Sequence, residues 1–197
     1  MHIFDINSST VYFKDIQLPA EQFPYSASWT VLSNGNLIYT GGYPALKLAW
    51  EIDLIEYTVK EHTAMIEGRE GHGICNFKDV IYVFGGNGPI SSAEKFDFGQ
   101  TWELIAPLSS KRSRVSCLVH KDHIYISGKH STVTEIYHPA TNSYQIMSSV
   151  LPSDSASIMM AVSGQHYIFR GDDFLRLNCD QGRTERLAGL PYSYWWS

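Results

Sequence analysis

Cysteine is scarce in this sequence of 197 residues. Only Cys75, Cys117 and Cys179 are present, and they are widely separated. A disulfide framework or a zinc site needs several cysteines, or cysteines and histidines, at short and characteristic spacings. We therefore expect neither feature. Cys75 and Cys117 are expected to pack as small apolar side chains, and a reducing, cytoplasmic location fits this composition best.

Long apolar runs and blocks of basic residues are also missing. No stretch has the length of a transmembrane segment, and no signal-peptide pattern opens the chain. The formal net charge is −5, from 15 basic and 20 acidic residues. Binding to nucleic acid or to an anionic membrane therefore has little electrostatic support, and we expect no nucleic-acid and no membrane partner.

Motifs that carry chemistry are equally absent. There is no glycine-rich phosphate-binding motif and no Gly-x-Ser-x-Gly nucleophile motif. The eight histidines include no pair at a metal-ligand spacing, and we expect them on the surface and in turns. Asp172 and Asp173 are adjacent, so on a strand they would point to opposite faces, and we interpret them as turn formers. The sequence predicts no catalytic residue, no metal site and no cofactor.

The apolar residues show no helical period, and they recur in a different pattern. Four short apolar runs, each leading to a glycine, occupy residues 37–42, 81–86, 124–129 and 166–171. In this alignment Gly41, Gly85, Gly128 and Arg170 are equivalent, and they lie 42 to 44 residues apart. Such a period indicates one supersecondary unit that is copied along the chain.

Each copy contains about four short segments rich in Val, Ile, Tyr and Phe, which are typical of strands. The first two segments of each copy are separated by a two-residue turn. Asn34-Gly35 is the strongest of these hairpin signals, because both positions favour positive φ. The equivalent turns are Lys78-Asp79, Lys121-Asp122 and Ser163-Gly164. The chain is therefore predicted to be all-β, in units of four strands.

The best-preserved copy resembles the kelch family. It has Arg69 and His72 before the first strand, Gly85-Gly86 after the second, and Trp102 near the end. The segment Glu94-Lys95-Phe96-Asp97 lies between the last two of these features. The resemblance implies a kelch-type β-propeller with four full four-stranded blades plus partial terminal strands. The full blades are expected at 24–66, 67–110, 111–153 and 154–190, with 1–23 and 191–197 as partial pieces. The glycines expected to have a structural role in the repeat are Gly41, Gly42, Gly85, Gly86, Gly128 and Gly171.

The two ends of the chain leave alternatives open. Residues 3–5 and 10–13 have the pattern of the outer strands of a blade, and residues 191–196 repeat the pattern of 24–29. One interpretation is a small ring of four blades with a composite fifth. The other, which we favour from the sequence, is a fragment of a parent with six or seven blades. In that case the aromatic residues 194–196 predict self-association through the incomplete terminal blade.

Strand direction predicts where a partner would bind. In an antiparallel blade of strands a to d, the d–a and b–c loops emerge on one face, here called the loop face. Binding loops on a rigid scaffold are typical of such a surface. The candidate partner-binding residues of the loop face are Tyr25, Ser26, Tyr43, Arg69, Glu70, Asn87, Arg112, Ser113, Arg114, Lys129, His130, Asp172 and Asp173.

The charges of the loop face predict an acidic or phosphorylated peptide as the partner, because arginine pairs well with carboxylate and phosphate. The basic residues fall in the second and third blades, and Asp172 and Asp173 in the fourth. The leading interpretation is a non-enzymatic protein-interaction module. Related propellers are attached to BTB/POZ domains in ubiquitin-ligase adaptors, so the resemblance implies an adaptor or scaffold role. The alternatives are a propeller enzyme acting on sugars or small molecules, and a fragment without a function of its own.

Overall fold

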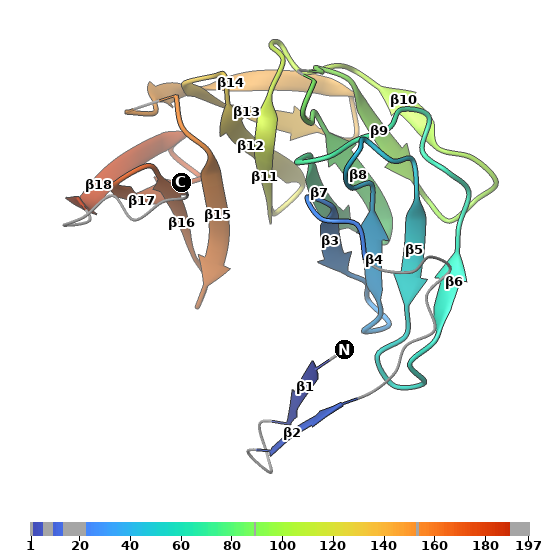
Figure 1. Cartoon of the computed structure of the whole chain (residues 1–197). Coiled ribbons are helices and arrows are strands. Elements are labelled where there is room, and N and C mark those ends of the chain that lie inside the picture. Colours follow the sequence, from blue (N-terminus) through green and yellow to red (C-terminus); the bar gives the residue numbers. More distant parts are fainter. Residues whose placement is uncertain (1, 6–9, 14–22, 89, 153, 190–197) are drawn as a thin grey trace.

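The computed structural model describes residues 2–5, 10–13, 23–88, 90–152 and 154–189, and all regular structure in these residues is β-strand. Four antiparallel sheets of four strands each follow one another along the chain. Figure 1 shows that they fan around a common axis as the blades of an open arc. This arrangement confirms the prediction of an all-β propeller with four full four-stranded blades.

Every blade is a simple up-and-down meander, because its strands lie in the sheet in chain order. Blade 1 comprises β3 (Ser28–Val31), β4 (Leu37–Thr40), β5 (Ala49–Ile52) and β6 (Val59–Glu61). Blade 2 comprises β7 (Gly73–Phe77), β8 (Val80–Phe84), β9 (Ala93–Phe96) and β10 (Glu103–Ile105). Blade 3 comprises β11 (Ser113–His120), β12 (His123–Lys129), β13 (Val133–His138) and β14 (Ser143–Val150). Blade 4 comprises β15 (Ser157–Val162), β16 (Gln165–Arg170), β17 (Asp173–Asn178) and β18 (Arg183–Gly189).

Two of the four predicted hairpin turns have positive φ at both turn residues. At Asn34-Gly35 only Gly35 has positive φ, and at Lys121-Asp122 only Lys121 does, so the prediction of positive φ at both positions of Asn34-Gly35 is wrong. Lys78 and Asp79 both have positive φ, of 53° and 58°, and Ser163 and Gly164 have φ of 49° and 75°. Two consecutive residues in this region form a type I′ turn, whose twist matches that of the flanking strands. These turns fix the register of the first two strands, so that Phe77 pairs directly with Val80.

The hydrophobic core lies between neighbouring blades rather than within them. Ile38 of blade 1 belongs to one buried cluster with Ile81 and Val83 of blade 2. Trp102 completes that cluster: its ring stacks on Phe96 at a centroid distance of 5.0 Å. Its indole Nε1 also donates a hydrogen bond of 2.8 Å to the carbonyl of Thr63, in the connection between the two blades. The repeated aromatic thus fills the space between sheets and satisfies its polar atom, as buried Trp requires.

The repeat glycines stand where the innermost strands are crowded by the next blade. Gly41 has φ of +66°, and a Cβ at this position would lie 2.3 Å from the carbonyl oxygen of Arg69. At Gly85, with φ of +62°, a Cβ would lie 2.8 Å from the carbonyl oxygen of Arg112. A side chain fits neither position, because the backbone of the following d–a loop passes too close.

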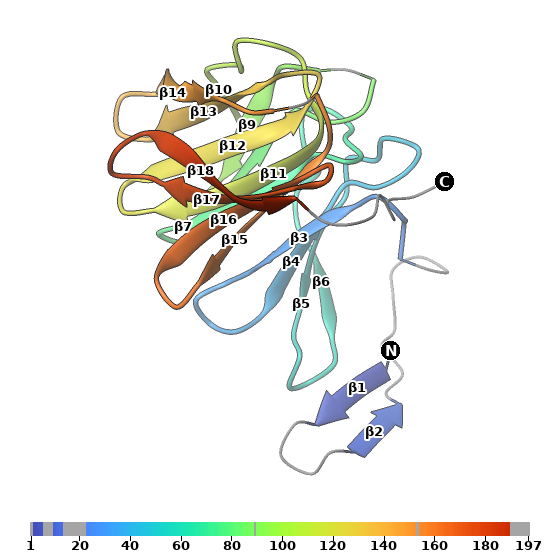
Figure 2. The ribbon, with the colours of Figure 1, turned by 90° about the vertical axis from the view of Figure 1, so that its left-hand side faces the viewer.

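The predicted N-terminal strands exist as a separate pair. β1 (His2–Asp5) and β2 (Thr10–Phe13) form a two-stranded antiparallel sheet, which lies apart from the four blades (Figure 1, Figure 2). The predicted start of a further blade at 191–197 lies outside the described residues. A composite blade made from both ends of the chain therefore stays a prediction.

Candidate partner-binding face

The loops predicted to share one face are connected by backbone hydrogen bonds between blades. The amide of Gly71 donates to the carbonyl of Ser26 at 2.8 Å, so two successive d–a loops are joined. The amide of Asn87 donates to the carbonyl of Glu70 at 2.7 Å, which joins a b–c loop to the d–a loop before it. The loop face is thus a continuous surface of hydrogen-bonded backbone.

Blade 1 contributes two exposed aromatic residues to the loop face. Tyr25 and Tyr43 stack with a centroid distance of 4.7 Å and an interplanar angle of 20°. Their exposed fractions are 64% and 50%, and the amide of Tyr43 donates to the carbonyl of Tyr25 at 2.8 Å. The neighbouring Ser26 is also exposed. A large apolar surface held rigidly in solvent is typical of residues that contact a partner.

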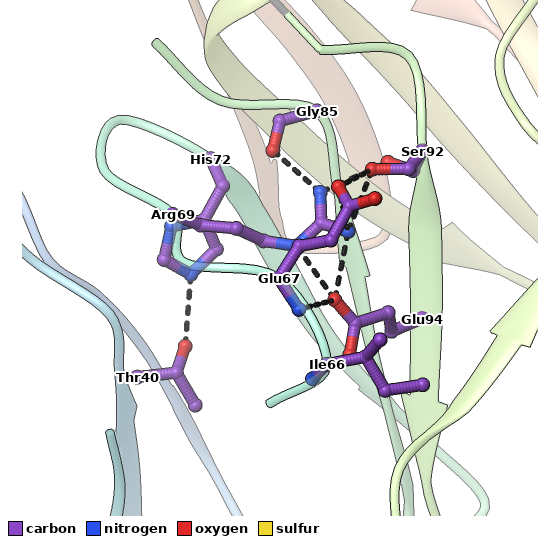
Figure 3. A network of polar contacts seen from close by, with 8 residues as sticks. All are labelled: Thr40, Ile66, Glu67, Arg69, His72, Gly85, Ser92 and Glu94. Carbon is purple, nitrogen blue, oxygen red and sulfur yellow. Dashed lines mark hydrogen bonds and ion pairs between the residues drawn. The ribbon is translucent and has the colours of Figure 1, made fainter. Parts of the chain in front are cut away.

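Arg69 has a different environment from the one predicted. Its side chain has no exposed surface and forms an ion pair of 2.9 Å with Glu94, which is also fully buried (Figure 3). The guanidinium Nη1 further donates to the carbonyls of Gly85 at 2.8 Å and of Ser92 at 2.9 Å. Arg69 therefore ties the d–a loop to β9 and to the b–c loop within blade 2.

Arg112 repeats this arrangement in blade 3. Its Nη2 pairs with Glu135 at 2.5 Å, and neither side chain has exposed surface. Nη1 donates to the carbonyl of Val133 at 2.8 Å. Burial lowers the pKa of Arg112, and the charge of Glu135 opposes that shift. The partners Glu94 and Glu135 stand at the same place on the third strand of their blades.

For three of the predicted binding residues, the structure differs from the prediction. Arg69 and Arg112 are wholly buried, and Ser113 is 6% exposed, so the prediction that their side chains are available to a partner is wrong. The physical reason is the glutamate on the third strand, which is buried beside each arginine and forms an ion pair with it. Sequence reasoning missed this pairing, although an acidic residue at a buried strand position in both blades was a signal for it.

Arg114 and Lys129 remain on the surface, as does His130. Arg114 lies in a β-bulge of β11, where the pairing register shifts between Ser113 and Ser116, and its φ is +46°. Bulges turn a side chain away from the regular alternation of a strand and occur often beside functional sites. Arg114 is exposed between the buried Ser113 and Val115, as the alternation of side chains along a strand requires.

A cavity of about 320 Å³ lies on the loop face where blades 3 and 4 meet. Arg114, Lys129 and Asp154 supply its charged lining, and Ile158 and Phe169 supply apolar surface. Sequence reasoning placed the two cations on this face but missed Ile158 and Phe169. Their only signal was the alternation of apolar residues along β15 and β16.

The remaining candidates are divided between paired and exposed positions. Glu70 and Asn87 are half-buried and bond to each other, with 3.1 Å between Nδ2 and Oε1. Asp173 is mostly buried and forms an ion pair of 2.7 Å with Arg186, whereas Asp172 is exposed. Of the two predicted acidic residues of the fourth blade, only Asp172 is exposed.

The model of the kelch motif matches residues 68–109, which span blade 2 together with the d–a loop before it. Blade 2 is a kelch repeat, and it lies in a chain of four such four-stranded blades. A comparison with curated proteins found no significant match.

The kelch motif of blade 2 contains the buried network just described, because Arg69, His72, Gly85 and Glu94 all lie within the matched residues. Kelch repeats in general form protein-interaction propellers. The family thus supports protein binding as the broad function of this chain. Among the described residues, no helix is long and apolar enough to span a membrane.

Blade 4 departs from the kelch pattern at Arg170, which replaces the repeat glycine. Its side chain is fully buried, and Nη1 donates to Ser157 Oγ at 2.6 Å and to Ser127 Oγ at 3.0 Å. Burial lowers the pKa of Arg170 to about 10. In this blade, a guanidinium that reaches into blade 3 replaces the close backbone contact made elsewhere by glycine.

His72 of the kelch motif links blades 1 and 2. It is buried, and its Nε2 lies 2.9 Å from Thr40 Oγ1. Burial and the nearby charge of Arg69 lower the pKa of His72 to about 3. The pKa of an unfolded histidine is about 6.5, so the neutral ring contributes stability above pH 6.5, and this stability is lost as the pH falls towards 3.

We therefore predict that the kelch chain loses stability below pH 6.5 and that His72→Gln removes part of this loss. A single such group contributes a slope of up to about 1.4 kcal/mol per pH unit between the two pKa values. Urea unfolding at pH 7, 6, 5 and 4 measures the slope, with the exposed-turn variant His130→Gln as the control. An unchanged slope in His72→Gln would contradict the assignment.

Proposed function

We propose that this kelch chain is a non-enzymatic interaction module that binds an acidic segment of a partner protein on its loop face. The binding site is the cavity between blades 3 and 4, with Arg114 and Lys129 as the cationic residues. The observation that carries the proposal is the difference between the arginines of blade 3. Arg112 has its own buried carboxylate, whereas Arg114 projects from a bulge beside the cavity.

The cavity combines charge with apolar surface, which favours a peptide over a small ion. Ile158 is 54% exposed, and Phe169 lines the cavity with it. Apolar contacts supply most of the binding energy at interfaces, and charges supply specificity and orientation. The partner segment is accordingly expected to present a carboxylate or phosphate next to a large apolar side chain.

The orientation of Asp154 affects which charge of a partner the cavity can bind. Asp154 lines the same cavity, and its carboxylate accepts a hydrogen bond from the backbone amide of His130. This contact directs the acidic group towards the b–c loop, so Arg114 and Lys129 keep their capacity for an incoming anion. The stacked Tyr25 and Tyr43, with Glu70 and Asn87, extend the proposed surface towards blade 1. Asp172, at the far end, would disfavour a second acidic group there.

The proposal is tested by selecting binders from a displayed peptide library and measuring the affinity of the selected peptides. We expect peptides enriched in Asp or Glu beside an aromatic or aliphatic residue. The double variant Arg114→Ala/Lys129→Ala should bind them at least about 100-fold more weakly, because it removes two charge-assisted hydrogen bonds that contribute about 1.5 to 3 kcal/mol each. Raising the salt concentration should weaken binding by the wild type more than binding by the double variant.

The matched control removes two exposed lysines elsewhere on the surface, in the variant Lys60→Ala/Lys78→Ala. It changes the net charge by the same amount, but Lys60 lies in β6 and Lys78 in a hairpin turn away from the loop face. Equal weakening by both double variants would reveal a general charge effect and overturn the site. Selected peptides without acidic residues would overturn the chemistry of the partner. An adaptor or scaffold role, a cytoplasmic location and self-association stay predictions.

A further inference from the structure

Blades 3 and 4 bring together three metal-ligating side chains at the opposite face of the propeller. His120 ends β11, His166 lies near the start of β16, and Cys179 directly follows β17. One potential ligand atom from each residue lies within 4.8 Å of the other two. Within the described part of the chain, no other group of three such side chains meets this condition. His120 and His166 are 46 positions apart in the sequence, and His166 and Cys179 are 13 apart. No short metal-binding motif therefore indicates this cluster.

The surrounding contacts hold the three residues in place. The rings of His120 and His166 meet edge to face at a centroid distance of 4.6 Å. The hydroxyl of Tyr125 donates to the carbonyl of Cys179 at 3.1 Å, which fixes the backbone that carries the thiol. Asp180 Oδ1 lies 3.4 Å from His120 Nε2 and also pairs with Lys121. A carboxylate beside a ligating histidine is a common supporting contact in metal sites.

We propose that His120, His166 and Cys179 form a Zn²⁺ site that joins blade 3 to blade 4. Imidazole nitrogen and thiolate sulfur are the ligands that Zn²⁺ prefers, and Mg²⁺ and Ca²⁺ prefer oxygen. A tetrahedral ion with bonds of about 2.0 to 2.3 Å separates its ligand atoms by about 3.3 to 3.8 Å. The side chains therefore need to approach one another by about 1 Å, which small rotations provide.

The fourth coordination position is assigned to water. His120 and Cys179 line a cavity of about 510 Å³ together with Asp180, so solvent reaches the cluster from that side. Three protein ligands and an open position distinguish this site from the closed, four-ligand structural sites of zinc fingers. The ion is accordingly expected to exchange with chelators without unfolding the blades.

Zn²⁺ binds cysteine as the thiolate, so the thiol proton of Cys179 leaves to solvent as the S–Zn bond forms. The affinity for Zn²⁺ is therefore expected to rise about tenfold per pH unit while the free cysteine is a thiol.

The test is a titration of the purified, chelator-treated chain with Co²⁺ and then with Zn²⁺. We expect one Co²⁺ per chain, with the thiolate-to-cobalt charge-transfer band and the visible bands of tetrahedral geometry, and displacement by one equivalent of Zn²⁺. A wild-type chain without a thiolate band would overturn the proposal, and this readout needs no variant.

Variants locate the site. Cys179→Ala or His166→Gln should weaken Zn²⁺ binding at least about a hundredfold, because even the loss of supporting contacts costs about 10- to 100-fold in affinity. Cys117→Ala controls for the loss of a thiol elsewhere. His123→Gln controls for a histidine that lines the same cavity, where it packs against His138 at 4.4 Å. Wild-type affinity in Cys179→Ala, or an equal loss in His123→Gln, would refute the assigned ligands.

Discussion

Replacing Glu94 with glutamine is expected to lower the free energy of unfolding by about 3 to 5 kcal/mol, because it removes the fully buried counter-charge of Arg69. Both side chains are fully buried, at 2.9 Å from each other. The second carboxylate, of Glu67, lies farther away, at 3.6 Å, and its side chain is 42% exposed. The Glu94 carboxylate also accepts hydrogen bonds from the backbone amides of Ile66, at 2.7 Å, and Glu67, at 3.1 Å. The carboxylate therefore organises the d–a loop as well as the arginine.

Urea unfolding followed by tryptophan fluorescence measures this effect, and Glu103→Gln is the matched control. Glu103 pairs with Lys95 at 3.0 Å, but its side chain is 61% exposed, and exposed ion pairs contribute about 0 to 1 kcal/mol. The two variants remove the same charge from neighbouring strands of one blade. If they unfold at the same urea concentration, the buried pair does not have the role assigned to it.

Gly41→Ala is expected to have the second large effect, with a loss of at least about 3 kcal/mol. Part of this cost is the left-handed backbone, which a residue with a Cβ adopts at a penalty of about 1 to 2 kcal/mol. The larger part is steric. The new methyl carbon would lie 2.3 Å from the carbonyl oxygen of Arg69 and 2.7 Å from Cε1 of His72. The first contact is with backbone, so the entire d–a loop has to move.

Gly164→Ala isolates the steric part of this prediction. Gly164 has φ of +75°, similar to Gly41, but no atom lies within 4 Å of the position that its Cβ would take. Gly164→Ala should therefore cost only the backbone penalty of about 1 to 2 kcal/mol. Thermal or urea unfolding of the two variants in parallel gives the difference. An equal loss of unfolding free energy in the two variants would mean that the close approach of the loop to Gly41 does not contribute to the cost of Gly41→Ala.

The local features of the fold could be predicted from short stretches of sequence. The turn at Lys78-Asp79 and the glycine at position 41 indicate the local backbone conformation, because that conformation depends on a few consecutive residues. The 42- to 44-residue recurrence of these signals was enough to predict the blades. Trp102 and Phe96, which stack on each other within blade 2, could also be recognised as repeat positions.

The side-chain partners of the candidate site could not be predicted in this way. Arg112 and Arg114 are separated by one residue and read alike in sequence. One is buried against Glu135 and the other lines a surface cavity, because a bulge shifts the strand register between Ser113 and Ser116. A register shift depends on how neighbouring strands and loops pack, and no residue type marks it.

Turn chemistry and apolar alternation act over a few residues, so the four full blades, their strand order and the face on which the d–a and b–c loops emerge could be predicted from the sequence. Which charges reach solvent and which are neutralised inside depends on tertiary packing, and so does the meeting of His120, His166 and Cys179. Those outcomes depend on contacts between residues that lie at least 13 positions apart in the sequence, and 46 in the case of His120 and His166. The packing of one blade against the next sets the distances between such residues.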